Sequence, residues 1–132
     1  MKSETDAVRD FVVDVLGCRC PEEAFLDIRL NKAPEPVGDV PLLFDIRVGG
    51  RLLIFGVASD HLRRPDALAM LVAAGKKTRD NHKFNRFRLV VVTDGAVAGN
   101  GLRGDFAVLP MVDDRIHLHV VAKGGVRGFI ED

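Results

Sequence analysis

The chain has 132 residues, the size of one ordinary domain, and this length is enough to bury an apolar core without disulfides or metals. Hydrophobic residues make up 47% and charged residues 29% of the chain, a globular balance that excludes a disordered protein. No apolar run approaches the roughly 20 residues that cross a bilayer. The chain starts with a polar, acidic segment unlike a secretory signal, so we expect a single cytoplasmic domain spanning residues 1–132.

The net charge is zero, but acidic and basic residues are segregated along the chain. Residues 1–45 contain ten acidic and five basic residues, whereas residues 61–88 contain eight basic and two acidic ones. Such a basic segment attracts either an anionic partner or the acidic half of the same chain. The candidate anion-binding residues in this segment are Arg63, Arg64, Lys76, Lys77, Arg79, Lys83, Arg86 and Arg88.

Apolar residues at three- and four-residue spacing predict an amphipathic helix near the N-terminus. Ser3 or Thr5 is placed to cap this helix, and Gly17 is placed to end it in the left-handed conformation. Pro21 suits the first position of a second, short helix, with Cys20 as its N-cap. The apolar positions of the first helix are Val8, Phe11, Val12, Val15 and Leu16.

The middle of the chain predicts strands and one long helix. The stretch "FLDIRL" indicates a strand, and "LLFDIRV" and "RLLIFGVAS" indicate a hairpin around Gly49 and Gly50, a turn that needs positive φ at both residues. The apolar run 52–57 is typical of a central strand covered on both faces. A helix over 65–79 is apolar almost all round and must be buried on more than one side, by the sheet and by the first helix or a dimer partner.

The stretch "FRLVVVTD" predicts a buried strand that follows a crossover helix and is therefore parallel to the strand before it. We expect residues 95–110 to form a long loop, "RIHLHVVAK" to form a final strand and "GGVRGFIED" to form a tail. The order of elements predicts an α+β fold, with a mixed four- to five-stranded sheet that contains the Gly-Gly hairpin and with two main helices packed on it.

The stretch "LGCRCPEE", the Gly-Gly hairpin and the strand "FNRFRLVVV" together resemble an uncharacterised family of small prokaryotic proteins. This family has no established activity. The resemblance therefore implies kinship and no function.

Cys18 and Cys20 are the two cysteines of the chain, and we expect them to form a joint between helices, because cysteine packs as a small hydrophobe. A thiol at a helix N-terminus is also stabilised as a thiolate, which keeps a redox role for Cys20 open. A third alternative adds His117 and His119, which share one face of the final strand, to make a four-ligand zinc site. The C-x-C and H-x-H spacings match known zinc motifs only weakly, so for the two histidines we favour a half-exposed edge strand, with no cofactor.

The stretch "GNGLRG", residues 99–104, has the spacing of a dinucleotide-binding loop. It does not follow a strand directly, Pro110 prevents a long helix after it, and no acidic residue is placed to bind a ribose. The sequence therefore gives no support for a bound dinucleotide.

The function that these features favour is a small non-catalytic module that binds a ligand or a protein, as a homodimer formed through its apolar helix. One alternative is a thiol-redox or zinc-binding protein that uses the C-x-C pair. A second alternative is nucleic-acid binding through residues 61–88, with Phe84 or Phe87 stacked on a base. The near-neutral charge and the absence of tyrosine and tryptophan weigh against this second alternative.

Overall fold

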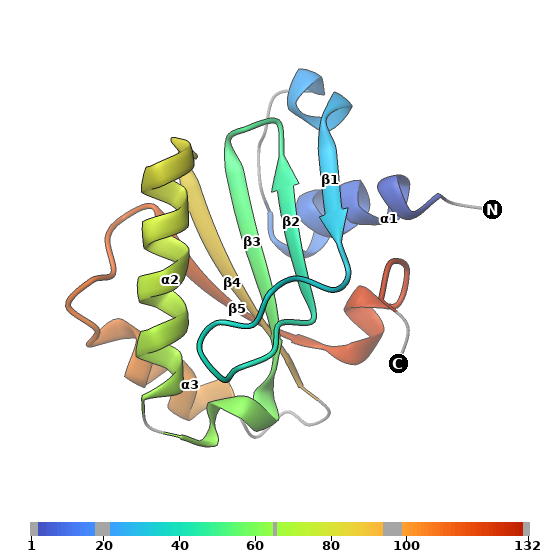
Figure 1. Cartoon of the computed structure of the whole chain (residues 1–132). Helices are drawn as coiled ribbons and strands as arrows, with labels where there is room; N and C mark the ends of the chain where they lie inside the picture. The colour runs from blue at the N-terminus through green and yellow to red at the C-terminus, as the bar shows by residue number, and fades with distance from the viewer. Residues whose placement is uncertain (1–2, 18–21, 65, 94–98, 131–132) are drawn as a thin grey trace.

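The computed structural model describes residues 3–17, 22–64, 66–93 and 99–130, and its strands form a mixed sheet that confirms the α+β prediction (Figure 1). In this part of the chain the sheet has five strands in the order β1-β2-β3-β4-β5. β2 runs antiparallel to both of its neighbours, β1 and β3, whereas β3, β4 and β5 run parallel to one another. The strands are β1 (Ile28–Asn31), β2 (Phe44–Val48), β3 (Leu52–Ala58), β4 (Arg86–Thr93) and β5 (Ile116–Ala122).

The predicted hairpin is the connection between β2 and β3. Gly49 and Gly50 have φ angles of 59° and 66°, the left-handed values that a two-residue turn of this type requires. Gly49 also has no room for a side chain, because a Cβ there would lie 2.7 Å from the Cα of Ala24. The hairpin prediction is therefore confirmed.

The N-terminal helix begins as an α-helix, α1 (Glu4–Asp10), and continues as one wider π-helical turn, η1 (Phe11–Val15). Ser3 caps it, since its Oγ accepts a hydrogen bond of 3.1 Å from the backbone N–H of Asp6. Gly17 follows with a φ of 67°, as the sequence predicted. The second, short helix is the 3-10 helix η2 (Glu22–Leu26).

The apolar helix is α2 (Ala67–His82), and parts of its own chain cover it on several sides. Its inner face packs on β3 and β4, and Met70 lies against Gly38, where a Cβ would be 2.9 Å from the methionine sulfur. The partly buried residues Leu109, Met111 and Val112 belong to the same apolar cluster. These contacts account for the apolar character of α2 without the dimer partner that the sequence suggested.

The prediction of a loop over residues 95–110 was wrong for residues 99–107, which form α3 (Gly99–Ala107). The glycines of this segment disfavour a helix, but tertiary contacts outweigh that propensity. Leu102 and Phe106, four residues apart on one helix face, join the apolar cluster around α2. A parallel connection from β4 to β5 also needs a crossover, which α3 supplies.

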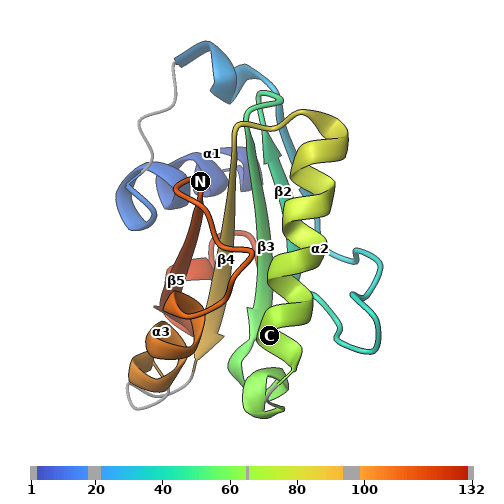
Figure 2. The ribbon, with the colours of Figure 1, turned by 90° about the vertical axis from the view of Figure 1, so that its left-hand side faces the viewer.

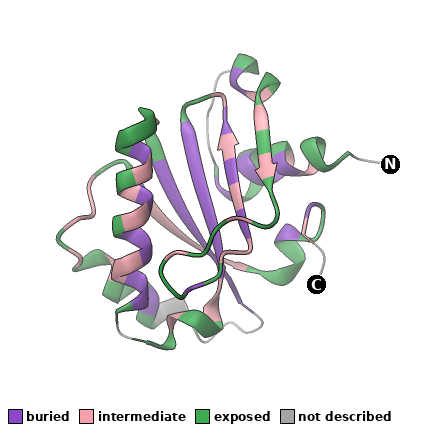
Figure 3. Ribbon diagram, in the orientation of Figure 1, coloured by how far each residue is buried: buried purple, intermediate pink, exposed green. Residues whose placement is uncertain are grey.

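Different helices cover the two faces of the sheet (Figure 2). We call the side with α2 and α3 the α2 face and the side with α1 and η1 the α1 face. On the α2 face Leu53, Phe55 and Leu89 pack against the helices, and on the α1 face Ile46 and Ile54 do so. Figure 3 shows that burial is deepest along β3 and β4, the strands covered on both faces.

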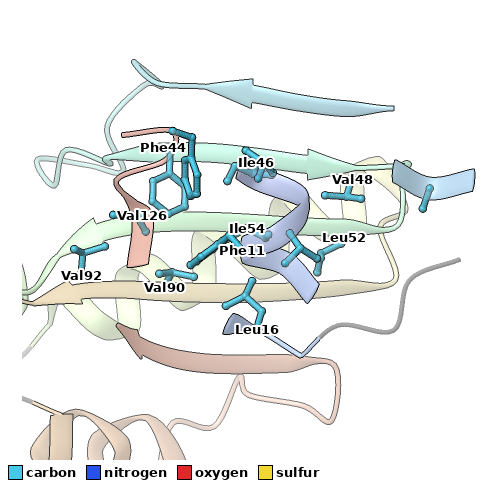
Figure 4. Packing of buried hydrophobic residues seen from close by; sticks show 14 residues of the cluster. Phe11, Leu16, Phe44, Ile46, Val48, Leu52, Ile54, Val90, Val92 and Val126 are labelled. Carbon is cyan, nitrogen blue, oxygen red and sulfur yellow. The ribbon is translucent and has the colours of Figure 1, made fainter. Parts of the chain in front are cut away.

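The C-terminal segment belongs to the core of the α1 face rather than forming a free tail. After the 3-10 helix η5 (Lys123–Val126), the ring of Phe129 lies edge to face with Phe11 and Phe44, at centroid distances of 5.2 and 5.4 Å. Figure 4 shows Val126 beside Phe44 in the same cluster. The two ends of the chain therefore stabilise each other across this face.

In the part of the chain that the structure describes, no helix is both long and apolar enough to span a membrane.

A buried ion pair fixes the C-terminal end of α2 to the segment before β5. Arg79 is 6% exposed, and its Nη1 and Nη2 donate hydrogen bonds of 3.0 and 2.9 Å to the two carboxylate oxygens of Asp113. These hydrogen bonds lower the pKa of Asp113 to about 2, while burial opposes the change. Asp80 is a second, more exposed partner of Arg79 at 3.0 Å.

We predict that Asp113→Asn lowers the free energy of unfolding by about 2 to 3 kcal/mol, because it leaves a buried guanidinium without its main counter-charge. The matched variant Asp80→Asn is expected to cost about 0.5 kcal/mol, because that carboxylate is mostly in solvent. Urea denaturation at pH 7 measures both. Equal losses in the two variants would contradict the assignment of Asp113 as the main partner.

Candidate functional site

The tripeptide Asp-Ile-Arg occurs twice in the chain, once at β1 and once in β2. Side chains two residues apart on a strand lie on the same face, so each Asp and its Arg are neighbours. Arg29 Nε lies 3.2 Å from Asp27 Oδ1, and Arg47 Nε and Nη2 each lie 3.2 Å from an oxygen of Asp45. Each arginine is thus held along its strand by an aspartate.

The register of β1 and β2 places Arg29 directly opposite Arg47. Two like charges facing each other across a ladder destabilise a sheet, and the two aspartates offset this repulsion. The pair lies on the α2 face, because Arg47 is also opposite Leu53, which packs against α2. The next positions along the ladder, Asn31 and Asp45, are polar as well.

The helix α2 crosses β3 and β4 and leaves the α2 face of β1 and β2 without a helix (Figure 1). Two shallow hollows of about 250 and 210 Å³ lie there, and both are lined by Arg29 and Arg47. We call them together the Arg29–Arg47 groove. Its further lining residues are Asp27, Leu30, Asn31, Asp45, Gly50, His82 and Phe84.

An aromatic side chain supports one arginine of the groove. The guanidinium carbon of Arg47 lies 5.6 Å from the ring centre of Phe84, within the range of a cation–π contact. His82 lies next to Phe84, with 6.1 Å between the two ring centres. The side chain of Arg47 is 33% exposed and that of Arg29 is 76% exposed, so Arg47 is the more firmly held of the two.

The arginine side chains of the groove have donor groups suited to an anion. A guanidinium has five N–H donors in a planar fork that matches the two oxygens of a carboxylate or a phosphate. Asp45 occupies the Nε and Nη2 side of Arg47, and the edge formed by the two Nη groups is a separate one. The internal aspartates orient the arginines, and the outer N–H groups are the ones available to a ligand.

The sequence-predicted thiol or metal site divides between described and undescribed residues. Cys18 and Cys20 lie outside the described residues, so the predicted helix joint and thiol site stay predictions. His117 and His119 lie on β5, an edge strand, and are half-buried, as the sequence favoured. Among the described residues, no group of three or more histidine, cysteine or acidic side chains is placed to hold a metal ion.

A buried arginine is the immediate partner of His119. Arg88 is 7% exposed, and its Nη1 lies 2.7 Å from His119 Nε2 and 3.3 Å from the carbonyl oxygen of Leu16. Since the guanidinium can only donate, His119 Nε2 accepts and the imidazole is neutral. Burial and then the positive charge of Arg88 lower the pKa of His119 to about 4, with smaller contributions from His117 and Arg103.

The pKa of His117 is lowered as well. Burial lowers its pKa, and the charges of Arg88 and Arg86 lower it further. The positive surroundings of both imidazoles oppose a bound metal cation, which would also have to displace Arg88 from His119 Nε2. The geometry therefore favours a structural role for these histidines over the zinc alternative.

The basic residues of segment 61–88 do not share one surface. Arg79 points into the ion pair with Asp113, whereas Arg88 contacts Leu16 and His119 on the opposite face of the sheet. Arg64 forms ion pairs with Asp39 and Asp66, and both contacts raise its pKa. Part of the local positive charge is thus neutralised within the chain.

The remaining basic residues of the segment lie in several different places. Arg63 Nη2 lies 3.8 Å from Asp60 Oδ1, and Lys76 Nζ donates a hydrogen bond of 3.1 Å to the carbonyl of Met111. Lys77, Lys83 and Arg86 are exposed. Of the two phenylalanines proposed to stack on bases, Phe87 is fully buried, and Phe84 lies in the Arg29–Arg47 groove.

Sequence reasoning missed Arg29 and Arg47. The signal was present as the repeated Asp-Ile-Arg tripeptide in two neighbouring strands. Its meaning depends on the register, because a shift of one residue would move one arginine to the other face.

The chain matches no protein-family model, no curated protein and no solved structure. The resemblance at residues 16–23 therefore stays a prediction.

We predict that the free energy of unfolding decreases as the pH is lowered from about 6.5 to 4, because of His119. The unfolded imidazole takes up a proton near its ordinary pKa of 6.5, whereas the folded one resists until about 4, so protonation favours unfolding over this range. His119→Gln keeps an acceptor for Arg88 but cannot titrate, and it should remove about 2 kcal/mol of this pH dependence.

The matched control is His61→Gln, because it makes the same chemical change at an exposed position. Urea denaturation of the three proteins at pH 7, 6 and 5 measures the difference. A wild-type pH dependence retained by His119→Gln would refute the role of this imidazole.

Proposed function

We propose that the protein is a small non-catalytic binding module and that its ligand carries a carboxylate or phosphate group bound in the Arg29–Arg47 groove. The observation that carries this proposal is the cross-strand pair itself. Two arginines stand directly opposite each other on a sheet face without a helix, at the junction of two hollows. Asp27 and Asp45 offset the repulsion between the two guanidinium groups, which therefore stay side by side on an open sheet face.

The groove is preorganised for an anion. Asp45 and the ring of Phe84 fix the guanidinium of Arg47 before any ligand arrives, so less side-chain entropy is lost on binding. The lining contains two arginines and two aspartates, so the groove has no large net charge. Recognition therefore depends on short-range donor geometry, and the affinity for a simple anion is modest.

We propose binding rather than catalysis because arginine stays protonated and supplies fixed positive charge rather than proton transfer. A ligand that combines an anionic group with a flat apolar group matches the groove best, since Phe84 lies beside Arg47. The proposed location of the protein is the cytoplasm.

The second candidate function is a thiol-redox protein that uses Cys18 and Cys20. The observation that favours it is the contact between Arg88 and the carbonyl of Leu16, which brings a positive charge close to the chain two residues before Cys18, because a nearby positive charge favours a thiolate. Native mass spectrometry of the purified protein tests it. The loss of two hydrogens would support this candidate, and a bare reduced chain would count against it.

Phenyl phosphate is the probe for the groove, and backbone amide chemical shifts in an NMR titration give both the affinity and the site. We expect shifts at Arg29, Arg47 and Phe84. Arg47→Gln should weaken binding about tenfold or more, because it removes a charge-assisted bidentate contact. Arg29→Gln should weaken it less, since that side chain is more exposed.

The matched control is Arg51→Gln, because Arg51 is an exposed arginine in the hairpin turn next to the groove. It has the same change in net charge, so long-range electrostatics are held constant. Equal weakening by Arg47→Gln and Arg51→Gln would show non-specific anion attraction and would refute the proposal. Binding that follows the whole of segment 61–88 instead would support the nucleic-acid alternative.

A further inference from the structure

The hollow of about 210 Å³ at the hairpin end of the Arg29–Arg47 groove is lined by more than the two arginines. Asp27 and Phe84 line it as well, so a negative charge, two positive charges and an aromatic ring face one small space. Pockets for drug-sized ligands have roughly 300 to 1,000 Å³, so this smaller hollow suits one small molecule. We call it the Asp27 hollow.

Asp27 is held in place by the sheet, and its side chain is open to solvent. Its carbonyl oxygen accepts a hydrogen bond of 2.8 Å from the N–H of Gly49, so Asp27 extends the ladder of β1 and β2 by one position. Its contact with Arg29 Nε uses Oδ1, and the side chain of Asp27 is 56% exposed. Oδ2 takes no part in that contact and can accept a hydrogen bond from a ligand.

The ladder also sets the spacing between the negative and the positive groups of the hollow. Asp27 is the diagonal neighbour of Arg47 across the two strands, and such neighbours lie about 7 to 8 Å apart. A cation and an anion that are adjacent in one small ligand fit between them, each beside the group of opposite charge.

Aromatic side chains complete the hollow. Phe84 is half-buried, and the guanidinium carbon of Arg47 lies 5.6 Å from its ring centre. The ring of His82 is tilted by 41° to that of Phe84. A flat apolar group of a ligand can pack against Phe84 while an attached carboxylate reaches Arg47.

We propose that the Asp27 hollow binds a free aromatic α-amino acid as a zwitterion. The arginine pair binds its carboxylate, Asp27 binds its ammonium group and Phe84 packs against its ring. This inference rests on the proposed function of the groove and names the class of ligand. At pH 7 a free amino acid carries both charges on one carbon, whereas an internal residue of a peptide carries neither.

The charges of the groove favour a ligand without net charge. The two arginines are balanced by Asp27 and Asp45. A simple anion is attracted by the guanidinium groups and repelled by the aspartates, whereas a zwitterion is attracted by both kinds of group. Because Asp27 is exposed, the ammonium contact adds a modest factor to the affinity rather than orders of magnitude.

Three ligands that differ in one group test the assignment by NMR titration of the backbone amides at pH 7. Phenylalanine has all three groups, 3-phenylpropanoate lacks the ammonium group and phenethylamine lacks the carboxylate. We expect phenylalanine to bind about threefold more tightly than 3-phenylpropanoate, and phenethylamine to bind most weakly. The shifted amides should include Asp27 as well as Arg47 and Phe84.

Asp27→Asn tests the ammonium contact itself. It should weaken the binding of phenylalanine about threefold and should not weaken that of 3-phenylpropanoate. A displaced Arg29 would weaken both ligands equally, so the difference between the two ligands reports the ammonium contact. Glu23→Gln is the matched control, because it removes the same charge at an exposed position in η2, and it should leave both affinities unchanged.

Phenylalanine that binds no more tightly than 3-phenylpropanoate would overturn this inference, and so would equal weakening of both ligands by Asp27→Asn. In either case, weaker binding of 3-phenylpropanoate to Arg47→Gln would leave the proposed function standing. If neither 3-phenylpropanoate nor phenyl phosphate binds in the groove, the proposed function fails and this inference fails with it.

Discussion

Side chains of a β-strand alternate between the two faces of a sheet, and β2 and β3 use this alternation differently. β3 is buried at six consecutive positions, so it needs cover on both faces. β2 is fully buried only at every second position, and its other side chains are Asp45 and Arg47. The apolar surface of the α1 face therefore extends over β2, whereas that of the α2 face ends at β3. The Arg29–Arg47 groove lies where the second apolar surface ends.

The connections of the parallel strands follow from the same arrangement. β3, β4 and β5 are neighbours in the order of the chain, and their crossovers through α2 and α3 pass over one face (Figure 2). Right-handed crossovers that advance in one direction must stay on the same face. The opposite face is left to the two ends of the chain, and the contact of Phe11 with Phe129 closes it.

Two buried arginines show how the chain accommodates positive charge in its interior. Arg79 has a carboxylate partner, Asp113, and the pair is held by two hydrogen bonds. Arg88 contacts the carbonyl of Leu16 and the imidazole of His119, which its charge helps to keep neutral. Both arginines belong to the segment whose composition suggested an anionic partner. A local excess of basic residues describes a surface only when the side chains reach it.

The sequence by itself determined the elements whose signals are local. The Gly49-Gly50 turn requires positive φ at adjacent residues, the run 52–57 requires cover on both faces, and Ser3 and Gly17 mark the ends of the first helix. Only the tertiary structure determined that residues 99–107 form the helix α3, because burial of Leu102 and Phe106 had to outweigh the low helix propensity of the glycines around them. The tertiary structure also determined the position of the Arg29–Arg47 groove, since the two arginines are 18 positions apart in the sequence and meet only through the strand register. The physical reason is that propensities act within a few residues, whereas register and burial depend on contacts between distant parts of the chain.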